Sequence, residues 1–195
     1  MGKFGTTALA AHQIALQTAS ILFMVPFGIA LAATVRVGHA VGRQDLRAAR
    51  RAGFAALGLG AVFMAGMTVC VAFSRSWIPL AFLGGGANAA PETVALAALL
   101  LAVGTSFFIF DGVQTIAAGG LRGLNDTRMP LLFAFVAFWP CGILAGYELA
   151  FRLGLEAVGI WIGLSLGLVV QAVLLIARFH VLTKRGQLPD MPHRA

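Results

Sequence analysis

VALAALLLAVGTSFFIFDGVQTIA, residues 94–117, is a run of 24 residues with a single charge, Asp111. About 20 apolar residues in a helix cross the ~30 Å hydrocarbon core of a bilayer. Four further stretches of 21–24 residues are also almost free of charge: residues 13–36, 52–73, 130–150 and 157–180. None of them shows the strict alternation of a transmembrane strand. The pattern predicts an all-α, polytopic helical membrane protein with about five transmembrane helices.

Composition supports this fold class. Of 195 residues, 59% are hydrophobic and 11% are charged, against about 25% charged in soluble domains. The mean hydropathy is +0.91. These values exclude a disordered chain and argue against a soluble domain. Two cysteines are too few for a disulfide framework. Nucleotide-binding and hydrolase motifs are missing from the sequence, so we expect no enzyme, and any transport would use an ion gradient or another subunit.

The basic residues predict the orientation. With the polar 37–51 link in the cytoplasm, eleven of the fourteen Lys and Arg residues fall on that side and three on the other. The positive-inside rule then places the N-terminus outside and the C-terminus in the cytoplasm. We expect residues 1–183 to form one membrane domain and residues 184–195 a polar cytoplasmic tail. This distribution explains the net charge of +7 without a nucleic-acid partner.

Asp111 is the strongest candidate for a functional residue. It lies eighteen residues into its span, where an ionisable group costs about 2.5–3.5 kcal/mol on insertion scales. In a continuous helix it would share a face with Gly104, Phe107, Phe108, Gln114 and Thr115. We interpret this stripe as a cation or proton site that lines a cavity. The alternative is a carboxyl group neutralised by an interhelical hydrogen bond.

The first span carries uncharged polar residues. Gln13, Gln17 and Ser20 share a helix face, with His12 beside them. Amides suit a wet cavity that binds substrates by hydrogen bonds, but equally they can hold helices together. In the last span, overlapping GxxxG units at Gly159, Gly163 and Gly167 predict close packing against a neighbouring helix.

Two blocks of sequence together resemble a known family. The first comprises ALAAHQIALQ (8–17), FMVPFGIA (23–30) and VRVG (35–38), leading to Gly42; the second is DGVQTIAAGGLRG (111–123), followed by Asp126 and Thr127. Their sequence and order resemble the MATE (multidrug and toxic compound extrusion) family, in its NorM-like branch. The resemblance covers nearly the whole chain apart from the tail.

The resemblance implies an architecture and a function. Family members have twelve helices in two six-helix lobes, and drugs exchange for Na⁺ or H⁺ through a cavity between the lobes. This sequence resembles helices eight to twelve, a partial C-terminal lobe. The implied function is that of a multidrug efflux antiporter fragment, which exchanges organic cations for Na⁺ or H⁺ across the inner membrane by alternating access. The implied partners are membrane lipid, small-molecule drugs, and the missing N-terminal lobe or a second chain; no organic cofactor is expected.

The resemblance also implies roles for individual residues of this chain. Asp111 matches the tenth-helix carboxylate implicated in cation binding, and we expect no metal site beyond Na⁺ there. Gln13 matches a drug-facing glutamine of the eighth helix, and Gln17 occupies a nearby cavity position. Phe107 lies one turn before Asp111, where relatives can carry a tyrosine. With Gln114, these residues form the predicted substrate cavity. The seventh-helix acid that partners Asp111 in the family has no counterpart, so weak cation binding is expected.

Two other functions remain open at this stage. The chain could be a truncated, non-transporting membrane protein or an assembly partner for another lobe, and we expect little or no transport from it alone. A lipid-linked sugar flippase of the same superfold would have more cationic residues in its cavity. The buried charge here is an acid, which counts against that function.

Overall fold

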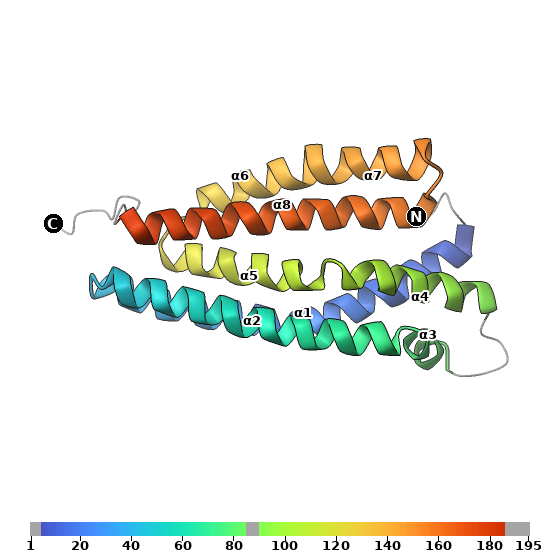
Figure 1. The fold of residues 1–195 in the computed structure, drawn as a ribbon, viewed down its shortest axis with the longest axis horizontal. Helices are drawn as coiled ribbons and strands as arrows, with labels where there is room; N and C mark the ends of the chain where they lie inside the picture. The colour runs from blue at the N-terminus through green and yellow to red at the C-terminus, as the bar shows by residue number, and fades with distance from the viewer. Residues whose placement is uncertain (1–4, 85–89, 186–195) are drawn as a thin grey trace.

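A computed structural model describes residues 5–84 and 90–185, and within these ranges the chain is almost entirely helical, without strands. The long helices lie side by side along one common axis (Figure 1). In chain order the elements are α1 (Gly5–Gly42), α2 (Leu46–Ser74), α3 (Trp77–Phe82), α4 (Pro91–Thr105), α5 (Phe108–Gly123), α6 (Arg128–Val136), η2 (Ala137–Leu144), α7 (Ala145–Tyr147), η3 (Glu148–Arg152) and α8 (Glu156–Arg185).

These elements form five crossings of the bundle. Four are long and apolar enough to span a membrane: α1, α2, the continuous run Arg128–Arg152, and α8; the bent pair α4 and α5 makes the fifth. The chain reverses direction at each crossing, so the start of α1 and the end of α8 lie at opposite ends (Figure 1). The prediction of an all-α protein with about five apolar spans is confirmed. Of the predicted tail, residues 186–195 lie outside the described residues.

The third crossing differs from the continuous helix that we predicted for residues 94–117. It is broken between α4 and α5, which meet at 50°. Thr105 Oγ1 donates to the carbonyl of Ala102 at 2.6 Å, and Ser106 Oγ donates to that of Val103 at 2.7 Å. Hydroxyl groups that bond the preceding turn compete with the helical backbone and bend helices. The face predicted across Gly104 and Asp111 is therefore interrupted.

The turn between the first two crossings is shorter than the predicted 37–51 link. α1 continues to Gly42, and α2 begins at Leu46. The carboxylate of Asp45 accepts a hydrogen bond from the backbone N–H of Ala48 at 2.8 Å. This is the N-cap interaction that satisfies one of the free donors of a helix start. Only three residues therefore lie outside the helices at this reversal. The short turn keeps the arginines at the end of α1 close to those at the start of α2.

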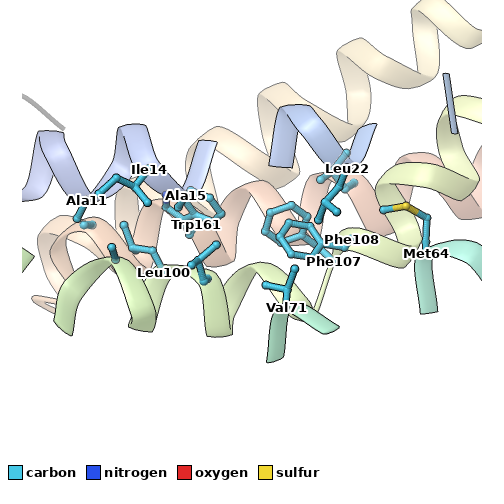
Figure 2. Packing of buried hydrophobic residues seen from close by; sticks show 14 residues of the cluster. Ala11, Ile14, Ala15, Leu22, Met64, Val71, Leu100, Phe107, Phe108 and Trp161 are labelled. Carbon is cyan, nitrogen blue, oxygen red and sulfur yellow. The ribbon is translucent and has the colours of Figure 1, made fainter. Parts of the chain in front are cut away.

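Two hydrophobic clusters fill the bundle. One joins the first half of α1 to α2, α4 and α8 and includes Phe107, Phe108 and Trp161, which lie in its middle (Figure 2). The other joins the second half of α1 to α2, α5 and α8, with Phe179 and Leu121 fully buried. The junction of α4 and α5 lies where the two clusters meet.

Glycines allow α8 to contact the preceding crossing. A Cβ atom added to Gly163 would collide with the backbone of Gly146, and one added to Gly159 would lie 2.6 Å from the backbone nitrogen of Ala150. The close approach predicted from the GxxxG units is confirmed. Pro140 lies in η2, a π-helical segment of this neighbouring crossing.

The outside of the bundle is apolar. Val62 is 75% exposed, Phe73 84% and Leu131 75%. In water such a surface would aggregate, whereas in a bilayer lipid chains cover it.

Candidate functional site

Asp111 lies in the first turn of α5, directly after the break. It is half-buried. Its Oδ1 accepts a hydrogen bond from Gln114 Nε2 at 3.4 Å, and Gln114 Nε2 also lies 3.0 Å from Thr115 Oγ1. A carboxylate in the first turn of a helix is stabilised by the helix dipole. Breaking the span therefore creates a favourable place for a negative charge inside the bundle.

The carboxylate of Asp111 has few partners. The two ion pairs in the described part of the chain join Glu148 to Arg152 and Asp126 to Arg178. Gln114 belongs to the same helix as Asp111, so their hydrogen bond is not the interhelical bond of the structural alternative. At 3.4 Å it is also long for a bond to a charged group. This geometry leaves the carboxylate available to a ligand, and cation binding stays a prediction.

A cavity of about 260 Å³ includes Asp111 in its wall. Three crossings build it: α1, the junction of α4 and α5, and α8. Its lining is otherwise uncharged and consists of Leu16, Ala19, Ser20, Phe23, Phe107, Trp161, Leu164 and Leu168. Cationic residues, which the flippase alternative requires, do not line this cavity.

Aromatic rings form one wall of the cavity. Phe107 is 3% exposed, and its ring centroid lies 5.6 Å from that of Trp161. Trp161 Nε1 donates a hydrogen bond to His12 Nδ1 at 3.2 Å, which links α8 to α1. His12 thus holds the indole in place. Sequence analysis missed Trp161, although a tryptophan in an apolar helix needs a partner for its N–H.

A second cavity, of about 410 Å³, adjoins the first through Phe23, which lines both. Gln114 and Thr115 contribute polar groups to its wall, and Arg122 also lines it. Gln114 therefore connects the two cavities, because its amide contacts Asp111 in one and lines the other. The structure brings together three predicted site residues, Asp111, Phe107 and Gln114.

Gln13 and Gln17 do not join this group. Both are exposed on α1 and neither lines the cavity of Asp111, whereas Ser20, on the same face, does line it. Their predicted contact with a drug stays a prediction.

Two further buried polar residues, Gln171 and Asp126, were assigned no role from the sequence. Gln171, one turn after Leu168, is 7% exposed, and its Oε1 has no hydrogen-bond partner among the described residues. Asp126 is 5% exposed and accepts from Arg178 Nε at 2.9 Å, which ties the α5–α6 turn to α8. A lone glutamine in an apolar span was the available signal for the first. The partner of Asp126 lies 52 residues away, beyond any local pattern.

Solved structures share this fold. A eukaryotic MATE transporter, AtDTX14, superposes with a TM-score of 0.82 at 23% identity, covering 92% of this chain and 40% of that one. A MOP superfamily transporter from Pyrococcus furiosus gives a TM-score of 0.79 at 19% identity, covering 98% of this chain and 41% of that one. At these identities the likeness establishes the fold.

Sequence comparisons establish the family. The chain is 62% identical over 178 residues to a probable multidrug resistance protein NorM of Rhodopseudomonas palustris, covering 91% of this chain and 37% of that protein. A probable NorM protein of Bradyrhizobium diazoefficiens is 53% identical over 185 residues, covering 95% and 40%. The chain thus spans about 40% of the length of these relatives. The MatE family matches residues 1–147. With its apolar crossings, the chain is a multi-pass membrane protein that belongs to the MatE family.

Proposed function

We propose that the chain forms part of a multidrug antiporter that exchanges organic cations for Na⁺ or H⁺ by alternating access. The observation that carries this proposal is a half-buried carboxylate, Asp111, without a cationic partner among the described residues, in a cavity walled by Phe107 and Trp161. A bound cation would neutralise the buried charge. Aromatic faces add attraction for an organic cation.

Exchange follows from competition for one carboxylate. A coupling ion and an organic cation both need the charge of Asp111, so binding of one lowers the affinity for the other. A broken helix suits such a site, because helix ends and unwound backbone inside the membrane supply polar groups where transporters bind ions and substrates. Gln114, which contacts Asp111, offers an amide group at this site.

The proposal includes a location and partners. The arginines near the α1–α2 and α5–α6 turns and the end of α8 gather at one end of the bundle, which we place in the cytoplasm, with the bundle in the inner membrane. The relatives are more than twice as long as this chain, and we propose that a second lobe or a second chain completes the transport pathway. The role is transport without catalysis.

A chimera tests this function. The region of the Rhodopseudomonas palustris relative that aligns with this chain is replaced by it, and efflux of a cationic fluorescent dye is measured in cells without other dye pumps. We expect dye efflux from the chimera and a loss of about ten-fold or more in efflux rate in the Asp111→Asn variant, because removing the charge weakens cation binding. Glu148→Gln, at an exposed ion pair, is the control and should leave efflux unchanged.

Two outcomes would contradict the proposal. If the chimera reaches the membrane in normal amounts but exports no dye while the unaltered relative does, this chain does not supply a working half. If Asp111→Asn exports dye at the normal rate, the carboxylate is not the exchange site.

A further inference from the structure

A groove with a basic wall lies at the arginine-rich end of the bundle, between the end of α1 and the start of α2. Its volume is about 650 Å³, against about 260 Å³ for the cavity of Asp111. Arg36, His39 and Arg43 line it from the end of α1 and the following turn, and Arg51 lines it from α2. Its other lining residues are small or apolar: Val35, Ala40, Ala48, Ala52 and Ala55.

The arginines of the groove are not neutralised within the described part of the chain. Arg36, Arg43 and Arg51 are exposed, and neither of the two ion pairs involves them. The nearest acid in sequence, Asp45, caps the N-terminus of α2 through Ala48 and does not line the groove. Three guanidinium groups therefore converge on one recess without an opposing carboxylate in its wall.

The walls of the groove continue into surface that lipid covers. Positions three, four and seven residues apart share a helix face. On α1 the wall at Val35 continues to Leu31, which is 50% exposed. On α2 the wall at Ala55 continues to Leu59, 62% exposed, and Val62, 75% exposed. A ligand in the groove would thus have cationic groups at one end and an apolar surface directly below them.

We propose that this groove binds the phosphate headgroup of an anionic phospholipid, with the acyl chains lying along α1 and α2. Guanidinium groups bind phosphate oxygens in a bidentate manner. Basic recesses between transmembrane helices at the cytoplasmic surface attract anionic headgroups. The apolar surface below the groove distinguishes a lipid from soluble phosphate, which would gain nothing from it. This site is separate from the cavity of Asp111 and does not depend on the proposed exchange, although its place at the cytoplasmic surface rests on the proposed orientation.

Lipid titration of the purified chain in detergent tests the site. Phosphatidylglycerol, phosphatidylcholine of the same chain length, and inorganic phosphate are added in parallel. Bound lipid is counted by native mass spectrometry, and the unfolding temperature is recorded. We expect phosphatidylglycerol to bind best, and Arg36→Gln or Arg51→Gln to lower its affinity about five-fold each. The triple variant R36Q/R43Q/R51Q should bind phosphatidylglycerol no better than phosphatidylcholine.

Matched controls separate this groove from general surface charge. Arg47 is exposed four residues before Arg51 but lies outside the groove, so Arg47→Gln should leave the affinity unchanged. Arg51→Lys keeps the charge and should bind with intermediate affinity, which keeps the test informative if a glutamine variant unfolds. The proposal is wrong if the triple variant retains its preference for phosphatidylglycerol, if Arg47→Gln weakens binding as much as Arg51→Gln, or if inorganic phosphate binds as tightly as the lipid.

Discussion

Asp111 and Asp126 show how two acids in one short region take different roles. Asp126 is 5% exposed and is paired with Arg178 at 2.9 Å. Asp111 is half-buried, and Gln114 at 3.4 Å is its side-chain hydrogen-bond partner. A buried charge that is fully paired holds elements together, whereas one with a weak partner can exchange it for a ligand. The contacts therefore give Asp126 a structural role and leave the carboxylate of Asp111 available for the binding that we propose.

The pairing of Asp126 predicts a loss of stability in Asp126→Asn. Breaking a buried ion pair costs roughly 3–5 kcal/mol, because the remaining charge is left uncompensated. Arg178 is 29% exposed, so water offsets part of this cost, and we expect about 2 kcal/mol. The measurement is the free energy of unfolding in detergent. The double variant Asp126→Asn/Arg178→Gln completes a double-mutant cycle that isolates the energy of the pair.

The exposed pair Glu148–Arg152 supplies the control for Asp126. Its side chains are 49% and 76% exposed, and such pairs contribute at most about 0.5 kcal/mol. If Arg152→Gln and Asp126→Asn lower the free energy of unfolding by the same amount, burial does not strengthen the Asp126 pair.

Trp161→Phe tests the contact that fixes the aromatic wall of the cavity. The substitution keeps a ring beside Phe107 but removes the N–H that His12 accepts. We expect a loss of about 1 kcal/mol in the free energy of unfolding, the net contribution of one hydrogen bond. Trp139→Phe is the control, because Trp139 is 60% exposed. A Trp161→Phe variant as stable as Trp139→Phe would contradict a structural role for the hydrogen bond.

At the scale of elements, the broken third crossing matters most. Hydropathy predicts one span over residues 94–117 because the run stays apolar across the position of the break, with Asp111 as its one charge. The bend depends on Thr105 and Ser106, whose hydroxyls bond the preceding turn. It places Asp111 in the first turn of α5 instead of mid-helix. The sequence contained the signal, Gly104-Thr105-Ser106, but small and hydroxylated residues are common in unbroken membrane helices, where they also mediate packing.

Helix packing at α8 predicts the effect of Gly163→Ala. The added Cβ would meet backbone atoms of Gly146 and the carbonyl oxygen of Gly142, which cannot move aside as a side chain can. Overpacking of this kind costs typically about 1–3 kcal/mol, measured as a lower unfolding temperature in detergent. In Gly66→Ala on α2, the added Cβ has nothing within 4 Å, so this variant should not lower the unfolding temperature. Equal behaviour of the two variants would rule out backbone contact at Gly163.

At the scale of the whole molecule, most basic residues and the cavity of Asp111 lie in different parts of the bundle. One end of the bundle holds the α1–α2 and α5–α6 turns and the end of α8 (Figure 1), and the basic residues are concentrated near these segments of the sequence. The cavity of Asp111 lies between α1, α8 and the α4–α5 junction. Gln13 and Gln17 are exposed on α1, the helix that also contributes Ser20 to the cavity. The proposed second lobe would give this face a partner.

The proposed orientation predicts opposite accessibility for the two ends. In a variant with Cys70 and Cys141 replaced by alanine, single cysteines are introduced as Gln44→Cys, in the α1–α2 turn, or Leu153→Cys, before α8. A membrane-impermeant maleimide applied to intact cells should label the second variant and spare the first, because Gln44 lies at the arginine-rich end. Labelling of the first and protection of the second would reverse the orientation.

The sequence by itself determined the fold class, the apolar spans and the family, and it singled out Asp111 as the candidate site residue. Hydropathy is a local property, and a bilayer needs only a sufficient length of apolar helix. Tertiary structure alone decided which side chains meet: Asp111, Phe107 and Gln114 come together, Trp161 joins them from α8, and Gln13 and Gln17 stay outside. The physical reason is that the rotation of each helix and the bend at Thr105 depend on packing between crossings. The sequence of one span does not show which side chains of the other spans it will meet.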